Sequence, residues 1–245
     1  MFKECCFNRQ VVDAGLEEAG VDGLESLLMV CYERLLRRYG RQGWWPGESR
    51  FEVMVGAILT QRTNWRNAER SIALLKDRGL MDPKALTRVD LGEVEEALKP
   101  TGLYREKAVY LKNMASLIVN DFNGDVDGLL RLPSDSLRRI LLSVKGVGPE
   151  TADSIILYAA EKPECVADAY TTRILNRLGL TRERRYDSVK RFLQKALPEK
   201  LEVLKEFHAL MVRHGKEMCK VKPKCEDCPL NDLCLYFEAG DGEKA

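Results

Sequence analysis

Four cysteines near the C-terminal end are the residues whose spacing most clearly predicts chemistry. Cys219, Cys225, Cys228 and Cys234 follow the spacing C-x5-C-x2-C-x5-C. Four thiolates at such short range can saturate a four-coordinate soft-metal site or hold a [4Fe-4S] cluster. Zinc sites usually combine two close pairs that are far apart. One close pair flanked on both sides favours the cluster, with zinc as the alternative, and unliganded cysteines seldom gather this densely.

Three lysines lie between the first two of these cysteines. Lys220, Lys222 and Lys224 alternate with other residues in this short loop. A basic loop held stiff by a metal group could grip phosphates. A solvated surface loop is the simpler interpretation, and both stay open.

A second motif joins two segments of helical pattern through Gly146, Val147 and Gly148. Glycine tolerates positive φ angles, so a tight turn is expected at the two glycines. The helix that follows begins with free amide groups and the positive end of its dipole, which suit a phosphate. Such a contact would position DNA without reading its sequence. A plain connection between two helices is the alternative.

Asp168 follows the hairpin after about one helix. A carboxylate at this place could stabilise a developing sugar cation or orient an attacking water. Aspartate is also a favoured N-cap, and a helix-like segment begins directly after it. From the residues alone, the cap is the simpler interpretation.

Aromatic residues and one glutamine could handle a base. Trp44, Trp45 and Trp65 are all the tryptophans of the chain. Stacking of a flipped base on such rings is worth about 1–3 kcal/mol. Core packing near Pro46 is the commoner fate of such residues. Gln61 lies between an apolar helical segment and a turn, where it could fill the gap left by an extruded base or be only a surface residue.

The elements that must position these side chains have a helical pattern almost throughout. Apolar residues recur at helical spacing, and no run shows a convincing strand alternation. Linkers are short, as in compact helical domains. The fold class predicted is all-α. The helices expected span residues 24–39, 51–60, 67–76, 92–98, 105–120, 134–144, 150–160, 169–177, 188–196 and 203–214.

The bulk properties allow one large domain or two small ones. The chain has 245 residues, of which 31% are charged, yet its formal net charge is +1. A nucleic-acid partner would therefore need a local basic face. No stretch approaches the ~18 apolar residues of a membrane span. Residues 1–10 lack an apolar signal-peptide core, so we expect a soluble, cytoplasmic protein.

Taken together, these motifs resemble the endonuclease III superfamily of helix-hairpin-helix DNA glycosylases. The likeness runs from about Phe51 to Phe237. It is carried by ILTQ at 58–61, TGLYREKA at 101–108, the hairpin, Asp168, and HGKEMC at 214–219 leading into the cysteines. The first loop of the cysteine cluster is one residue shorter than is usual in the family.

The resemblance implies two helical domains with DNA bound in the cleft between them. A six-helix domain with the hairpin would span 42–162. The other would combine 1–41 with 163–245 and carry the iron–sulfur loop at 215–237. The expected protein is a nucleoid-associated monomer on damaged duplex DNA.

The resemblance also implies roles for individual residues. Asp168 would be the catalytic carboxylate and Gln61 the wedge. The DNA backbone would be held by Lys145, Gly146, Val147, Gly148, Thr151, Lys220, Lys222 and Lys224.

Bifunctional members of the family carry a lysine in the hairpin helix that forms a Schiff base and nicks the strand. Glu150 stands at the matching position. A glutamate cannot form an imine, so we expect a monofunctional enzyme with weak or no lyase activity. Lys145 could in principle substitute.

A subgroup of the family resembles the chain more closely. The strings QGWWP at 42–46 and KGVGPETAD at 145–153 look like the endonuclease III-like 3-methyladenine glycosylases. By this resemblance, the base pocket would be lined by Trp44, Trp45, Pro46 and Trp65, with Glu150 nearby. The alkyladenine-specific member lacks the cluster cysteines, which is a departure from this chain.

The expected substrate is an alkylated purine. Alkylation at N3 or N7 makes the base cationic, and tryptophan rings favour such a base by cation–π attraction. One alternative is a glycosylase for damaged or mismatched pyrimidines or uracil, with or without lyase activity. Another is a non-catalytic iron–sulfur DNA-binding protein, against which Asp168 argues.

Overall fold

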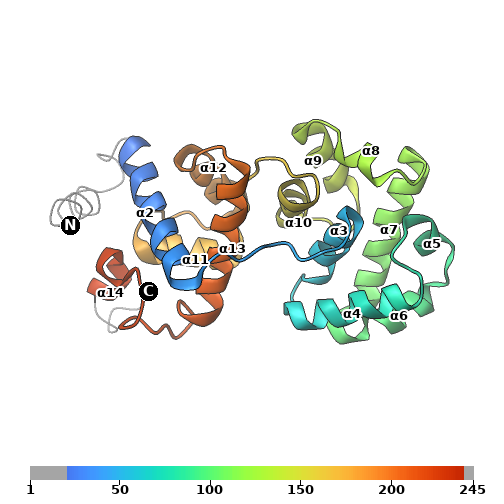
Figure 1. Cartoon of the computed structure of the whole chain (residues 1–245), viewed down its shortest axis with the longest axis horizontal. Coiled ribbons are helices and arrows are strands. Elements are labelled where there is room, and N and C mark those ends of the chain that lie inside the picture. The colour runs from blue at the N-terminus through green and yellow to red at the C-terminus, as the bar shows by residue number, and fades with distance from the viewer. Residues whose placement is uncertain (1–20, 240–245) are drawn as a thin grey trace. The chain divides into compact units, whose positions relative to one another are not determined.

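The computed structural model describes residues 21–239, and this part of the chain consists of helices joined by loops, without strands (Figure 1). The all-α prediction is thereby confirmed. Cys5, Cys6 and the N-terminal segment 1–10 lie outside the described residues. Within residues 21–239, no helix combines the length and the apolar character that crossing a bilayer requires.

The chain divides into two compact units. Unit 1 combines the residues up to Trp44 with those from Pro163 onward, and unit 2 is Trp45–Lys162. The first boundary falls between two adjacent tryptophans rather than after residue 41.

Unit 2 is built around helix α3 (Arg50–Leu59), of which every residue from Phe51 to Leu59 is buried. Apart from Glu52, which pairs with Lys76, these residues are apolar or glycine, and such a helix must lie inside a core. α3 packs against α4, α7, α8 and α10. The helices around it are α4 (Trp65–Asp77), α5 (Pro83–Arg88), α6 (Leu91–Leu98), α7 (Tyr104–Phe122), α8 (Val126–Leu130), α9 (Ser134–Ser143) and α10 (Pro149–Ser154). A 3-10 turn at Lys99–Thr101 follows α6, and a π-helical turn at Ile155–Ala159 continues α10.

Unit 2 therefore holds eight α-helices, where six were expected. The two extra helices, α5 and α8, are only 6 and 5 residues long, too short to show a helical period. Both are fixed by an N-cap instead. Asp82 accepts a hydrogen bond from the Ala85 amide and Asp125 accepts one from the Gly128 amide, each at 2.8 Å.

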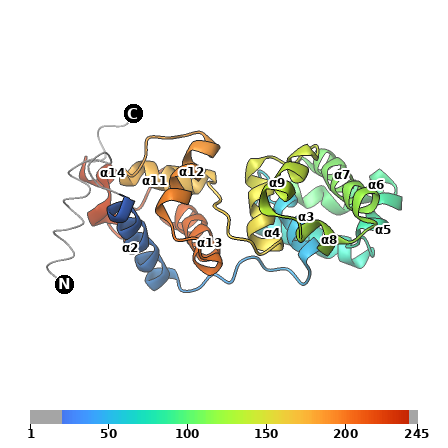
Figure 2. The same ribbon diagram turned by 90° about the horizontal axis from the view of Figure 1, so that it is seen from above.

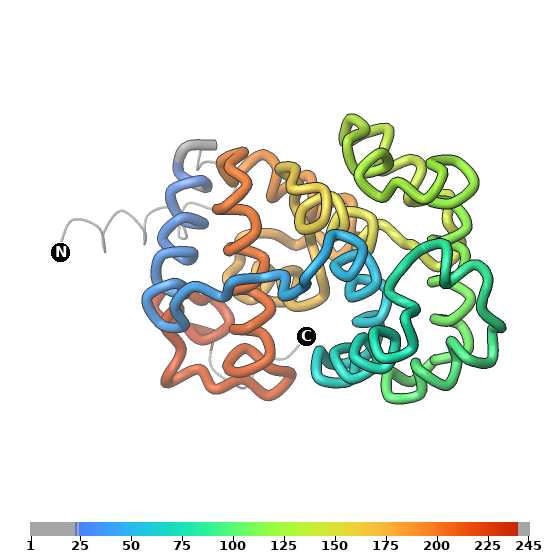
Figure 3. The backbone as a smooth tube through the Cα atoms, turned by 45° about the vertical axis from the view of Figure 1, so that its right-hand side comes forward, coloured from blue at the N-terminus to red at the C-terminus, as the bar shows by residue number. Residues whose placement is uncertain are grey.

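Unit 1 is assembled from both ends of the chain, as the blue and the orange-to-red segments of Figure 3 show. Helix α13 (Leu201–Glu217) packs against α2 (Val21–Tyr39) and α11 (Ala169–Leu178), and α12 (Tyr186–Ala196) packs on α2 (Figure 2). A 3-10 turn at Asn231–Leu233 and the short α14 (Leu235–Glu238) follow. At Gly215, α13 comes so close to α11 that an added Cβ would lie 2.6 Å from the Tyr170 ring.

Candidate functional site

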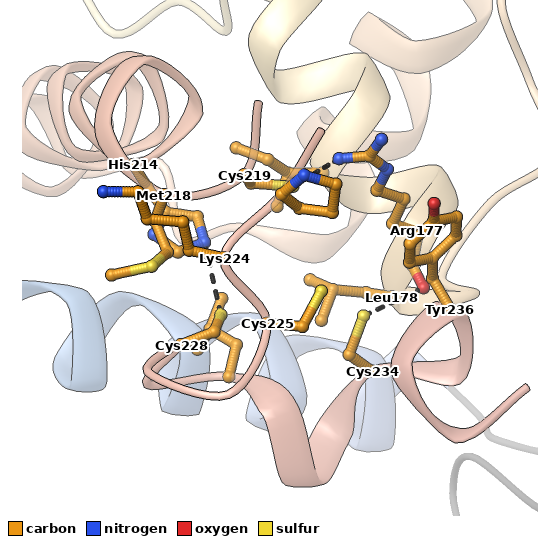
Figure 4. A pocket seen from close by; sticks show the side chains of 13 residues that line it. Arg177, Leu178, His214, Met218, Cys219, Lys224, Cys225, Cys228, Cys234 and Tyr236 are labelled. Carbon is orange, nitrogen blue, oxygen red and sulfur yellow. Dashed lines mark hydrogen bonds between the residues drawn. The ribbon is translucent and has the colours of Figure 1, made fainter. Parts of the chain in front are cut away.

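The four clustered cysteines line one pocket in unit 1, which we call the cysteine pocket (Figure 4). Its remaining walls are Ile174, Arg177, Leu178, His214, Met218, Pro223, Lys224, Leu230 and Tyr236. Within residues 21–239, no three side chains of metal-binding type converge closely enough to hold a single metal ion. Four cysteines around one pocket are the number of ligands that a [4Fe-4S] cluster requires.

Local turns wrap the loop around this pocket. The amide of Cys219 donates to the carbonyl of His214 at 2.9 Å, just past the end of α13, and the Cys228 amide donates to the Cys225 carbonyl at 3.1 Å. Leu230 and Leu233 are buried and anchor the loop to unit 1. The spacing of the cysteines therefore corresponds to one compact loop.

Two side chains outside the loop contact ligand sulfurs. Arg177 donates from Nη1 to Cys219 Sγ at 3.3 Å, and His214 Nε2 lies 3.6 Å from Cys228 Sγ. Sequence reasoning missed both. His214 belongs to the HGKEMC string, whereas Arg177 has no local signal.

Two thiols of this pocket, those of Cys228 and Cys234, are costly to ionise. Burial raises the pKa of Cys228 to about 11 and also raises the pKa of Cys234. Metal ligation requires thiolates, so the positive charge of an iron group must compensate for this cost. A fifth cysteine, Cys31 of α2, is fully buried, and burial raises its pKa to about 12. It is therefore an inert thiol.

The lysines that were predicted to contact phosphates lie in the same loop, and one of them, Lys224, also lines the cysteine pocket. Lys220, Lys222 and Lys224 are all exposed. The Lys224 amide donates to the Met218 carbonyl at 3.1 Å, so the backbone of this loop returns to the end of α13.

Asp168 is the N-cap of α11. Its Oδ1 accepts a hydrogen bond from the Thr171 amide at 2.7 Å, and the residue is buried. Its Oδ2 lies 4.0 Å from Nε2 of His208, a ring whose pKa is lowered by burial. The cap fixes one carboxylate oxygen and leaves the other directed towards His208.

Aromatic and basic groups extend this arrangement into what we call the Asp168 cluster. The Trp44 ring meets the His208 ring edge-on, with 6.0 Å between centroids. Lys216 Nζ lies 5.8 Å from the ring centroids of both Trp44 and Tyr170. Partial burial lowers the pKa of Lys216, and the charge of Asp168 opposes that shift. Of these residues, sequence reasoning missed Tyr170, His208 and Lys216.

The other predicted base-pocket residues lie in unit 2. The Trp45 ring lies 5.8 Å from the Trp65 ring and 5.4 Å from the Tyr158 ring. It packs on α3 so closely that a Cβ at Gly56 would lie 2.7 Å from Trp45 Nε1. Trp65 and Pro46 line an open hollow together with Glu48, Glu52, Glu69, Ile72, Ala73 and Lys76. Trp45 is half-buried and packs against α3 and two aromatic rings, and Glu150 is exposed in the first turn of α10.

The hairpin lies between α9 and α10. Gly146 has a φ of 101°, and an added Cβ would lie 2.0 Å from the Tyr110 ring. Gly148 has a φ of −89° with open space around it. The expectation of a left-handed turn is therefore correct for Gly146 and wrong for Gly148, which is the extended N-cap of α10.

Side chains hold the hairpin in place. Gln61 donates from Nε2 to the Gly146 carbonyl at 2.9 Å and to Thr151 Oγ1 at 3.0 Å. Arg138 of α9 holds the fully buried Asp153 of α10 through two contacts of 2.7 and 3.1 Å. The structure therefore brings Gln61, the turn and Thr151 together. Lys145 and Val147 belong to the same turn, the former exposed and the latter buried.

Two family models match the chain. Residues 55–199 match the HhH-GPD superfamily of base excision DNA repair proteins. Residues 221–234 match the iron–sulfur binding domain of endonuclease III. This second match covers three of the four clustered cysteines, and the prediction of an iron–sulfur cluster is confirmed.

Known proteins resemble the chain over most of its length. A protein of Methanocaldococcus jannaschii, whose name proposes a DNA repair glycosylase without a substrate, is 45% identical over 86% of this chain and 96% of its own. A solved endonuclease III–DNA complex superposes with a TM-score of 0.76 at 24% identity, covering 88% of this chain and 97% of that one. A 3-methyladenine DNA glycosylase of H. pylori, bound to 1,N6-ethenoadenine, gives a TM-score of 0.70 at 25% identity, covering 79% and 97%.

The matched motifs coincide with the features built above. The HhH-GPD match contains the hairpin and Asp168, and the iron–sulfur match lies in the loop of the cysteine pocket. The chain belongs to the HhH-GPD superfamily as an endonuclease III-like, base excision DNA glycosylase with an iron–sulfur cluster.

Proposed function

We propose that this glycosylase hydrolyses the N-glycosidic bond of alkylated purines, of the 3-methyladenine kind, flipped out of duplex DNA. The observation that carries the proposal is the Asp168 cluster, in which the rings of Trp44 and Tyr170 accompany a capped carboxylate. Lys216 already lies near both rings, in the manner of a cation–π contact. The same rings suit a cationic base.

The chemistry of an alkylpurine fits this composition. Alkylation at N3 or N7 weakens the glycosidic bond, so the departing base needs little acid catalysis. The carboxylate of Asp168 stabilises the oxocarbenium-like sugar and helps a water attack it. Because Oδ1 accepts the capping hydrogen bond, Oδ2 is the oxygen that faces the sugar in this proposal.

DNA is held in this proposal by backbone contacts. The turn at Gly146 and Gly148 presents amides to a phosphate. Gln61, whose side chain donates to the Gly146 carbonyl, lies beside the turn and serves as the wedge. The supporting contacts come from Lys145, Val147, Thr151, Lys220, Lys222 and Lys224. The cluster ligands are Cys219, Cys225, Cys228 and Cys234, and when bound the cluster stiffens the loop that carries three of the lysines.

The enzyme acts as a monomer and leaves the strand intact. Glu150 is exposed at the start of α10, where bifunctional relatives carry the amine. Without an amine at this position no Schiff base forms there. The product is therefore an uncleaved abasic site.

The test of this proposal is Asp168→Asn. Asparagine also caps helices, so the variant removes the charge and keeps the cap. Base release should fall by about 10²–10³-fold, the usual cost of losing transition-state charge stabilisation, while affinity for the damaged duplex stays near the parental value.

Asp82→Asn is the matched control, because Asp82 caps α5 through a 2.8 Å hydrogen bond of the same kind. It should leave excision unchanged. Equal loss of excision and affinity in Asp168→Asn, or no loss of either, would reduce Asp168 to a helix cap.

A further inference from the structure

A pair of contacts in unit 1 joins α2, α13 and the cysteine pocket through His214. The ring Nδ1 lies 3.0 Å from the Tyr39 hydroxyl. Nε2 lies 3.6 Å from Cys228 Sγ (Figure 4). Tyr39 ends α2, and His214 lies in the last turn of α13. The residue is only 1% exposed, so water does not compete for its ring nitrogens.

Cluster ligation fixes the direction of both hydrogen bonds. A cysteine binds iron as a thiolate, which accepts hydrogen bonds and cannot donate them. His214 Nε2 must therefore carry the hydrogen that faces Cys228. A neutral imidazole has one N–H, so Nδ1 must accept, and the Tyr39 hydroxyl must donate to it.

We propose that Tyr39 and His214 form a directed hydrogen-bond relay that sets the reduction potential of the iron–sulfur cluster through Cys228. The inference rests on the assignment of Cys228 as a cluster ligand. Hydrogen bonds to cluster sulfurs are among the groups that set such potentials. Because the reduced cluster carries one more negative charge, an N–H donor stabilises it more than the oxidised cluster. Removing the donor therefore makes the potential more negative.

Tyr39 acts through His214 and is a positioning residue. Its hydroxyl holds the ring orientation and the tautomer, as partners of ligand-contacting histidines commonly do. Tyr39 is absent from the residues that line the cysteine pocket. Tyr39→Phe therefore changes the relay without changing a pocket wall, and it keeps the ring that packs 6.0 Å from the His214 ring.

The experiment compares the full-length, cluster-loaded parent with Tyr39→Phe, His214→Phe and Tyr236→Phe. Tyr236 lines the pocket and stacks its ring 4.6 Å from the Arg177 guanidinium, so Tyr236→Phe removes a pocket hydroxyl and keeps the stacking ring. Iron content and absorbance establish loading, and voltammetry gives the potential. Tyr39→Phe should load fully and shift the potential to a more negative value, His214→Phe should shift it further, and Tyr236→Phe should match the parent.

A second readout tests the direction of the relay. The chain has two histidines, so ¹⁵N-histidine labelling yields two ring systems, which a His208 variant distinguishes. His214 in the loaded parent should show a protonated Nε2 and an unprotonated Nδ1. The opposite tautomer would overturn the relay. An unchanged reduction potential in cluster-loaded Tyr39→Phe would also overturn the relay. If Tyr39→Phe fails to load the cluster, Tyr39 is a residue needed for cluster assembly instead.

Discussion

Lys107 shows how strongly burial can alter one residue of this fold. The residue is 1% exposed, and its ammonium donates to the Leu59 carbonyl at 2.9 Å and the Thr101 carbonyl at 3.0 Å. These carbonyls lie at the end of α3 and in the 3-10 turn that follows α6, where backbone acceptors lack helical partners. Burial lowers the pKa of Lys107 to about 8. The lysine thus satisfies two helix ends while its charge is disfavoured.

This lowered pKa predicts a pH dependence of stability. Lysine in the unfolded chain keeps a pKa of about 10.4, so between about pH 8 and that value the unfolded state binds more protons than the folded state. Stability contributed by this group therefore rises with pH across this window, and the full penalty of charging is present below it. From pH 7.5 to 10, the parent should gain about 2 kcal/mol in free energy of unfolding relative to Lys107→Met.

Denaturant unfolding of both proteins at the two pH values measures this difference. Lys112→Met is the control, because Lys112 lies on the same helix and also donates to two carbonyls, at 3.3 and 2.6 Å, but is only partly buried. Parallel pH curves for the parent and Lys107→Met would contradict the assignment.

At the scale of elements, the two hairpin glycines should respond differently to alanine. At Gly146 the φ of 101° and the Tyr110 ring both oppose a Cβ, whereas Gly148 has an ordinary φ and open space. Gly146→Ala should lose more than about 1 kcal/mol of stability and weaken binding to undamaged duplex. Thermal unfolding should find Gly148→Ala near the parent, and equal effects of the two substitutions would refute this account of the turn.

Long helices were predictable because each buries a periodic apolar face. Short ones were not, since α5 and α8 are defined by one capping aspartate rather than by a period. The adjacent Trp44 and Trp45 show another limit. Their spacing suggested one pocket, yet one ring packs with His208 in unit 1 and the other with Trp65 in unit 2. Whether a tryptophan ring packs in unit 1 or in unit 2 depends on tertiary contacts, which the local sequence pattern does not indicate.

The same reasoning separates the predictable site residues from the others. The cysteines, the hairpin and Asp168 carry local spacing or turn chemistry. Tyr39 and His214 meet across 175 positions of sequence, and nothing near either residue indicates the other. Arg177 contacts Cys219 and Lys216 approaches Trp44 only because folding brings distant segments of the chain together.

At the scale of the whole molecule, the proposed machinery is divided between the units. Unit 2 carries the hairpin and Gln61, whereas unit 1 carries Asp168 and the cysteine pocket. The formal net charge of +1 is too small to attract DNA broadly. Affinity in this account therefore depends on local contacts, the hairpin amides and the exposed lysines of the cysteine loop.

The most direct measurement is base release from duplexes that carry 3-methyladenine, 7-methylguanine, hypoxanthine, uracil or thymine glycol, each analysed with and without alkali. We predict release of the alkylated purines, with strand breaks only after alkali, and release lowered by about 10²–10³-fold in Asp168→Asn. Preference for a neutral lesion would contradict the alkylpurine assignment. Strand cleavage without alkali would show that an amine elsewhere in the chain forms the Schiff base, although position 150 is a glutamate. The monofunctional assignment would then be wrong.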